Sequence, residues 1–342
     1  MALSIIMARG NDSPRAFHND MGDAIMPSAN LPPRSGRQFS LKHGDYVAVV
    51  TELGASLREL AYQSKEVVCS WPADETAPCS NGRVLIPFPN RIADGAYTFG
   101  GTTYQLSIDE IERRNAIHGY GYRSYWELET LEDDRVTLSW RVPQISGYPF
   151  YLLVTADYRL TDDGLHLRIT AANHGKQRAP WAFGLHPWFA NGFDGYGDEI
   201  DGFNAQCRVT IPGDTHVTVD ERLLPTGTEP VDGTKYDLRE GQLLTQQPYD
   251  DAWTDLHHAA DGTTTAEFER PDGLAVQVVG DESITSFQVC TGTGFPAFKH
   301  PSGVAIEPQT AYANAFNTGK DLIAIEPGDT ASTSLLIHAE QR

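Results

Sequence analysis

The chain is poor in cysteine, and its cysteines stand far apart. Its 342 residues include four, and no two of them form a C-x-x-C pair. This spacing excludes a zinc knuckle and a dithiol redox motif of the C-x-x-C kind. We therefore expect free thiols in a reducing cytoplasm. The four residues are Cys69, Cys79, Cys207 and Cys290.

Positive charge is also scarce. Lys and Arg number 26 against 46 Asp and Glu, which gives a formal net charge of −20 at pH 7. A surface with this balance repels nucleic acid and anionic membranes, so we expect neither as a partner. A neutral small molecule fits this charge better.

Long apolar runs are missing as well. No stretch approaches the length of a membrane span. The short apolar run of residues 1–7 has no basic region before it, and Arg9 follows it, so it is a poor secretory signal. We expect a globular cytoplasmic protein, either a monomer or a homodimer.

Three familiar cofactor and metal motifs are absent. The sequence has no G-x-G-x-x-G after a strand, no P-loop and no H-E-x-x-H. We therefore expect no cofactor and no bound metal.

Apolar and polar residues alternate with a period of two, which is the pattern of half-buried strands. Residues 136–142, 152–160 and 165–170 show it clearly, and residues 97–104 predict a hairpin that turns on Gly100 and Gly101. With 31 glycines, 21 prolines and no long amphipathic helix, the chain is predicted to be all-β, a large antiparallel β-sandwich.

The chain divides into an arm and one domain. Residues 1–36 are rich in Asn, Asp, Ser, Pro and Arg, and we expect a poorly ordered arm there. No linker interrupts residues 37–342, so they are predicted to form a single domain. Within it, residues 194–202 and 225–241 are expected to be irregular surface segments.

The most informative stretch is residues 179–189, APWAFGLHPWF. Pro187 keeps His186 out of helical geometry and cannot donate to a sheet ladder, so His186 is predicted to end a strand and face a cleft. A proton-transfer residue is expected in such a place. A buried core histidine is the alternative.

A second polar position follows another apolar run. In residues 304–309, VAIEPQ, Glu307 is predicted to end an apolar strand before Pro308. Together His186 and Glu307 give the chain a candidate acid and a candidate base.

Three further clusters interrupt the strands. Asn90 and Arg91 follow an apolar strand, and Arg91 either binds a ligand hydroxyl or pairs with a carboxylate. His118 lies among glycines that allow close backbone approach, or it is an ordinary loop histidine. Asp250 and Asp251 stand near Trp253, where a carboxylate and an aromatic face suit a sugar, although a solvated acidic turn explains them equally.

These clusters, in their order and form, resemble the aldose 1-epimerase (galactose mutarotase) family over about residues 38–338. The resemblance implies a galactose mutarotase-like antiparallel supersandwich that acts on a monosaccharide. One departure is that Pro187 and Trp188 follow His186, where the galactose mutarotase form has Tyr. The motifs that carry the resemblance are residues 90–97 (NRIADGAY), 115–119 (NAIHG), 184–189 (GLHPWF), 250–253 (DDAW), 305–308 (AIEP) and 314–317 (NAFN).

The resemblance also implies roles for single residues. Glu307 is the general base and His186 the general acid, while the sugar ligands are His118, Arg91, Asp250 and Asn90. Asp251 competes with Asp250 for its role. A base at the C1 hydroxyl and an acid at the ring oxygen open a hemiacetal, and this needs no nucleophile, metal or nicotinamide.

The expected function is interconversion of the α and β anomers of a free hexose such as galactose or glucose. A hexose-6-phosphate 1-epimerase is one alternative, with Arg113, Arg114 and Arg123 near His118 as phosphate ligands. A sugar-binding sandwich without catalysis is another. A glycoside hydrolase fits less well, since it needs a pair of carboxylates.

Overall fold

The computed structural model describes residues 31–193, 199–245, 248–296 and 300–342. Most of the predicted N-terminal arm, residues 1–30, lies outside the described residues. The fold belongs to the unit Pro32–Arg342. At the start of that unit Ser35 is buried, and its hydroxyl donates to the Ala73 carbonyl at 2.6 Å.

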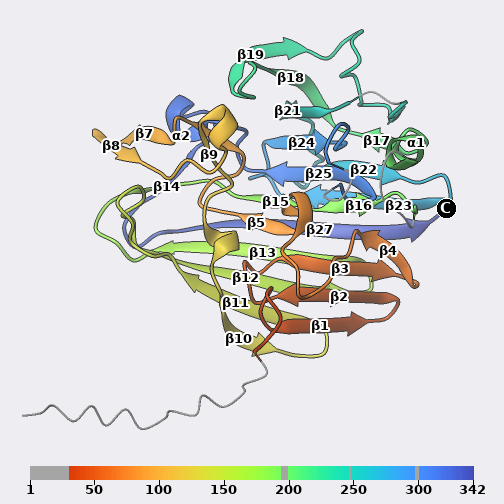
Figure 1. Ribbon diagram of the computed structural model, residues 1–342, viewed down its shortest axis with the longest axis horizontal. Helices are drawn as coiled ribbons and strands as arrows, with labels where there is room; N and C mark the ends of the chain where they lie inside the picture. Colours follow the sequence, from red (N-terminus) through yellow and green to blue (C-terminus); the bar gives the residue numbers. More distant parts are fainter. Residues whose placement is uncertain (1–30, 194–198, 246–247, 297–299) are drawn as a thin grey trace, which may run out of the picture. The chain divides into compact units, whose positions relative to one another are not determined.

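Two large antiparallel sheets make up the fold (Figure 1). The first sheet has the order β1-β2-β3-β4-β16-β25-β24-β21-β18-β19, and β15 joins it by pairing with β25 and β5. Its strands are β1 Gln38–His43, β2 Tyr46–Thr51, β3 Leu57–Tyr62, β4 Lys65–Val68, β5 Arg83–Leu85, β15 Gly184–His186, β16 Trp188–Ala190, β18 Gly213–Val219, β19 Pro225–Pro230, β21 Asp250–Leu256, β24 Ser286–Cys290 and β25 Gly303–Gln309.

The second sheet has the order β10-β11-β12-β13-β27-β23-β22-β17-β20. Its strands are β10 Glu127–Leu131, β11 Arg135–Arg141, β12 Leu152–Thr161, β13 Gly164–Asn173, β17 Arg208–Thr210, β20 Gln242–Leu243, β22 Thr264–Glu269, β23 Leu274–Gly280 and β27 Thr330–Gln341.

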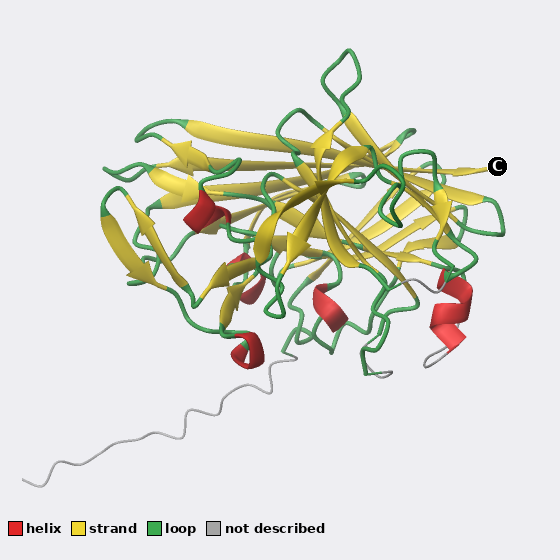
Figure 2. Cartoon of the chain, turned by 90° about the horizontal axis from the view of Figure 1, so that it is seen from above, coloured by secondary structure: helices red, strands yellow, loops and turns green. Residues whose placement is uncertain are grey.

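Short pairs and helical turns complete the described chain, and Figure 2 shows the helices within the connections between strands. The pairs are β6 Arg91–Ala93 with β9 Asn115–Ile117, β7 Ala96–Phe99 with β8 Thr102–Gln105, and β14 Ala179–Trp181 with β26 Ile323–Ile325. The helical segments are η1 Pro78–Ser80, η2 Ile111–Arg113, η3 Gly121–Arg123, α1 Glu199–Asn204 and α2 Ala315–Thr318. None of these described helices has the length and apolar character needed to cross a membrane.

The main core lies between the two sheets. Strands β1 and β2 contact β12 and β13 across it, and one continuous cluster of buried apolar side chains joins them. Strand β12 places its even-numbered residues 152–160 in this core, because successive side chains of a strand point to opposite faces. The predicted sandwich and its period-two strands are therefore confirmed.

The glycine hairpin is confirmed as well. Strands β7 and β8 pair from Ala96 to Gln105, and Gly100 and Gly101 form the two-residue loop. Both glycines have positive φ, 57° and 80°. Such a loop follows the twist of the two strands, and side chains rarely tolerate it.

The prediction for residues 225–241 was wrong at its start. Strand β19, Pro225–Pro230, pairs with β18 at the edge of the first sheet. Edge strands tolerate proline because one row of their N–H groups faces away from the ladder. In the other segment expected to be irregular, residues 199–202 form the start of α1. Residues 194–198 lie outside the described residues.

Candidate active site

Two strands of the first sheet bring His186 and Glu307 into contact. His186 is the last residue of β15, as predicted, and β15 lies between β25 and β5. The Nε2 atom of His186 is 3.2 Å from Oε1 of Glu307, and the two side chains are 9% and 3% exposed. Glu307 does not end its strand, because β25 continues through Pro308 to Gln309. That detail of the prediction was wrong.

Burial opposes charge on both members of this pair. Burial raises the pKa of Glu307 well above its usual value; the charge of Asp250 adds to this, while Gln309 and Arg91 oppose it. Burial also lowers the pKa of His186 to about 3. The Gln309 amide donates to Glu307 Oε2 at 3.0 Å. The pair therefore favours its uncharged forms when no ligand is bound.

His118 lies beside His186, with ring centroids 5.4 Å apart in an edge-to-face arrangement. The backbone N–H of Asn90 donates to His118 Nδ1 at 3.2 Å, so a neutral His118 carries its proton on Nε2. Burial, followed by the charges of His186 and Arg91, holds the pKa of His118 well below its usual value. The His118 imidazole is therefore expected to be neutral, with its Nε2–H as the hydrogen-bond donor.

The predicted close approach of the backbone near His118 is confirmed at Gly119. This residue has φ +65°, and a Cβ there would lie 2.0 Å from the carbonyl oxygen of Ile86. Only glycine fits such a position without moving the backbone.

The structure shows one of the two roles left open for Arg91, the pair with a carboxylate. Its Nε and Nη2 atoms donate to the two carboxylate oxygens of Glu110 at 2.9 and 3.0 Å, a two-point contact that fixes the guanidinium. Its Nη1 donates to Asn90 Oδ1 at 3.3 Å. Arg91 and Asn90 nevertheless line a pocket together with Asp250 and Gln288.

The two neighbouring aspartates point to different places. Asp250 lines the pocket, and Gln288 donates to its Oδ1 at 2.8 Å. Asp251 contacts His216 Nε2 at 2.9 Å instead. Burial, opposed by Arg91 and Gln288, raises the pKa of Asp250. Of the two candidates, Asp250 is the one the structure places with Arg91 and Asn90.

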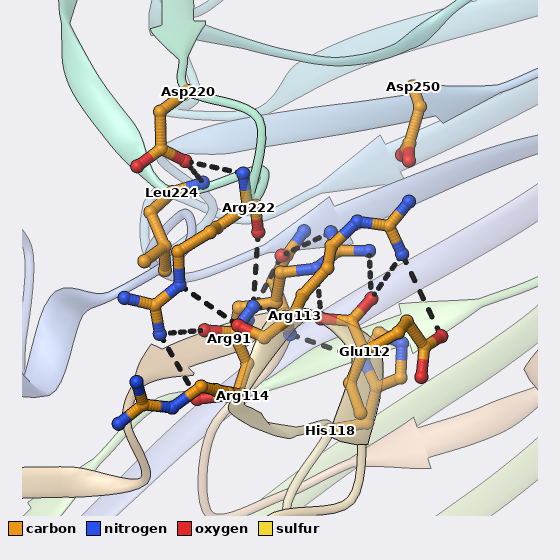
Figure 3. Close-up of polar contacts among 12 residues, drawn as sticks. Arg91, Glu112, Arg113, Arg114, His118, Asp220, Arg222, Leu224 and Asp250 are labelled. Carbon is orange, nitrogen blue, oxygen red and sulfur yellow. Dashed lines mark hydrogen bonds and ion pairs between the residues drawn. The ribbon is translucent and has the colours of Figure 1, made fainter.

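The three arginines considered as phosphate ligands are each paired with carboxylates. Arg113 binds Glu110 at 3.0 Å, Arg114 binds Asp94 at 3.2 Å and Arg123 binds Asp109 at 2.9 Å. Figure 3 shows Arg113 and Arg114 within a network of contacts around Arg91, and Asp250 outside it. Because each of these three arginines has a different carboxylate partner, they do not form a common phosphate site.

Sequence reasoning missed four polar residues near the site. Gln288 is a buried amide within the apolar strand β24, and that was a usable signal. The other three have no local signal, because their importance depends on which strands are neighbours. They are Arg83, His216 and Gln309.

The described residues contain no group of three or more His, Cys, Asp and Glu side chains that could hold a metal ion.

Comparison with known proteins identifies close similarities. The profile of the family described as aldose 1-epimerase matches residues 37–338. The uncharacterized protein YihR of Escherichia coli K12 is 32% identical over 295 residues, covering 86% of this chain and 90% of that protein. Galactose mutarotase of Rattus norvegicus is 34% identical over 165 residues, covering 46% of this chain and 45% of that protein.

Solved structures show the same fold. The GalM/aldose epimerase homologue from C. elegans has a TM-score of 0.77 at 20% identity, covering 89% of this chain and 99% of that one. A putative aldose 1-epimerase from Escherichia coli K12 has a TM-score of 0.74 at 20% identity, covering 90% and 99%. The fold is thus the galactose mutarotase-like antiparallel sandwich.

Proposed function

Since this chain belongs to the aldose 1-epimerase family, we propose that it interconverts the α and β anomers of a hexose with a free C1 hydroxyl. Galactose and glucose are the hexoses with which this proposal is to be tested. The observation that carries this proposal is the contact of His186 with Glu307 at 3.2 Å, near a pocket lined in part by Arg91, Asp250 and Gln288. An acid and a base this close can act on two oxygens bonded to the same carbon.

The reaction needs two proton transfers. Glu307, as carboxylate, takes the proton of the C1 hydroxyl while His186, as imidazolium, gives one to the ring oxygen, and the C1–ring oxygen bond breaks. After rotation about the C1–C2 bond, the ring oxygen attacks the other face of the aldehyde and both protons return. The pair holds one proton in total throughout, so each residue serves as acid in one direction and as base in the other.

The free protein favours the uncharged pair, with the proton on Glu307. This is also the protonation state of the pair after ring opening, because Glu307 has then gained a proton and His186 has lost one. Binding of a sugar brings hydroxyl groups that solvate the carboxylate, which favours the charged form needed for opening.

The remaining polar groups position the sugar in this proposal. Arg91 is held by Glu110, His118 has its Nε2 proton free to donate, and Asp250 is oriented by Gln288. Donors and acceptors fixed before the ligand arrives bind hydroxyls with little loss of entropy. Asn90 fixes Arg91 and His118 from its own backbone and side chain.

We expect the protein to act in the cytoplasm as a monomer or homodimer. The support for the compartment comes from the sequence, whose widely spaced cysteines suit a reducing environment, and the acidic balance suits a small-molecule partner.

The test is a paired measurement on wild type and Glu307→Gln. Glutamine keeps the shape and hydrogen bonds of the site but takes up no proton, so galactose affinity by calorimetry should persist while anomer equilibration by polarimetry falls by about 10²–10⁴. Equilibration at the wild-type rate in the variant would remove Glu307 as the base. A wild type that binds but does not equilibrate sugar would be a binding module.

A further inference from the structure

Four polar residues lie in one row across the first sheet. Gln288 pairs with Glu307, and the register of β15 on β25 places His186 across from Glu307. On the other side of β15, His186 pairs with Arg83 of β5. Directly opposed residues of antiparallel strands point to the same face. Arg83 is therefore the next side chain after the candidate acid, on the side away from Glu307.

Among the described residues, Arg83 has no carboxylate partner. Its guanidinium donates to Ser80 Oγ at 3.2 Å and to the Ala77 carbonyl at 3.4 Å, and it lies 4.3 Å from the centre of the Tyr122 ring. In the described parts of the chain no carboxylate forms an ion pair with it. A guanidinium has five N–H groups, so donors remain. Burial lowers the pKa of Arg83, as expected for a cation without a counter-charge.

This end of the site is cationic although the chain is strongly acidic. Arg123 lies 4.9 Å from the ring centre of Tyr122, whose ring Arg83 also contacts, but Arg123 is paired with Asp109 at 2.9 Å. Arg83 is therefore the cation at this end that has no carboxylate partner among the described residues. After burial, His186 and Arg91, the charges of Arg83 and Arg123 also lower the pKa of His118. Glu307 and Asp250 lie on the other side of His186, where burial raises the pKa of both and the nearby charge of Arg91 lowers it in part. A locally cationic site in a chain of net charge −20 favours a ligand with negative charge at one end.

The order of atoms in a pyranose determines which end of the sugar faces Arg83. The atoms O1, C1, ring oxygen, C5 and C6 follow one another around the sugar. With Glu307 at O1 and His186 at the ring oxygen, C5 and its C6 substituent extend toward Arg83. We propose that Arg83 binds an anionic group at C6, so that the substrate class is an acidic hexose bearing a carboxylate, phosphate or sulfonate. This inference rests on the proposed epimerase function.

An oxyanion is the ligand that Arg83 suits best. Guanidinium groups bind carboxylate, phosphate and similar groups through two parallel N–H donors. A C6 hydroxyl accepts one hydrogen bond and leaves the cation without a counter-charge. Neutral hexoses are therefore expected to be substrates, but poorer ones.

The experiment compares kcat/KM for anomer equilibration of glucose, glucuronate, glucose 6-phosphate and 6-deoxy-6-sulfoglucose. In the wild type at least one acidic sugar should exceed glucose by about tenfold or more, as a charge-assisted hydrogen bond predicts. In Arg83→Gln the ratio of acidic to neutral sugar should fall by about tenfold or more. The sugar with the highest ratio identifies the anion.

Two controls keep the result interpretable. Arg135→Gln removes an arginine of β11 in the other sheet, paired with Asp157 at 2.8 Å, and should leave the ratio unchanged. Arg83→Lys retains the charge and should keep part of the preference if Arg83→Gln fails to fold. The wild-type preference should also weaken between low and high ionic strength.

The outcomes separate this inference from the function on which it rests. If the wild type equilibrates no sugar, the epimerase function itself fails. If it equilibrates glucose with no preference for any acidic hexose, or if Arg83→Gln slows all sugars equally, the anionic subsite is wrong and the function stands.

Discussion

Glu307 and His186 are two titratable side chains that are buried and in contact. Their protonation is therefore coupled, and the apparent pKa values describe the pair rather than either residue. In the proposed reaction the pair holds one proton. A second proton binds only at low pH because burial lowers the pKa of His186 to about 3. The remaining proton dissociates at a pH above the usual pKa of a glutamate, because burial raises the pKa of Glu307.

We therefore expect a bell-shaped profile of kcat/KM for the pair. Its acid limb should lie well below pH 6.5, the value for an ordinary histidine, and its alkaline limb above pH 4.5. Polarimetry across this range, with the uncatalysed rate in each buffer subtracted, measures both limbs. An acid limb close to pH 6.5 would contradict burial as the controlling factor.

The same burial predicts a stability effect of Glu307. Its pKa is higher in the folded than in the unfolded chain, so stability is lost as the pH rises from the unfolded value toward the folded one. Glu307→Gln avoids this loss and should raise Tm at pH 8 by about 2 °C or more, with no gain below pH 4. Calorimetric scans at both pH values test this.

The exposed Glu326, which pairs with Arg178 at 2.6 Å, provides the comparison. Glu326→Gln should not raise Tm at pH 8, because exposed ion pairs contribute little to stability and this carboxylate remains hydrated. A fall in Tm at pH 8 for Glu307→Gln would show that the carboxylate stabilises the folded chain.

At the scale of elements, strand β18 forms one wall of the pocket, and side-chain contacts on its opposite face hold it to the neighbouring strands. Val217 and Val219 face the pocket, while His216 lies on the opposite face of the strand. The His216 ring contacts Glu229 of β19 at 3.0 Å and Asp251 of β21 at 2.9 Å. It donates to both carboxylates only when doubly protonated.

Replacing His216 with Phe keeps a flat ring against Tyr236, whose centroid lies 3.4 Å away, but removes both hydrogen bonds. The partly buried Asp251 is then left without this donor, which costs about 1–3 kcal/mol. We expect a lower Tm and a higher KM, because Asp250 is the neighbour of Asp251. In the matched variant His257→Phe, an exposed histidine 2.9 Å from Asp214 is lost, and KM should not change.

The sequence predicted those elements whose pattern is local. Strand β12 alternates along its whole length, and the Gly100–Gly101 hairpin has the residues its loop requires. Strand β19 was missed because an exposed edge strand buries no alternating face. Arg83 and His216 were missed for a different reason, since their neighbours are set by sheet register between segments far apart in the chain.

At the scale of the whole molecule, the sandwich encloses most of its cysteines. Cys69, Cys207 and Cys290 are at most 5% exposed, and burial raises the pKa of each thiol. Since the thiolate is the reactive form, all three should resist alkylation by iodoacetamide in the folded protein. Mass spectrometry should show their modification only after unfolding in guanidinium, and fast labelling of any of them in the native protein would contradict this packing.

The row of Arg83, His186 and Glu307 also has a consequence for how the molecule would acquire the proposed activity. Its three members come from strands β5, β15 and β25, which lie far apart in the sequence and meet only in the finished sheet. Long-range pairings of this kind form slowly, because the intervening chain must first be ordered. During refolding, β-structure measured by circular dichroism should return before catalysis does, so the appearance of enzyme activity would report the closing of the last strands.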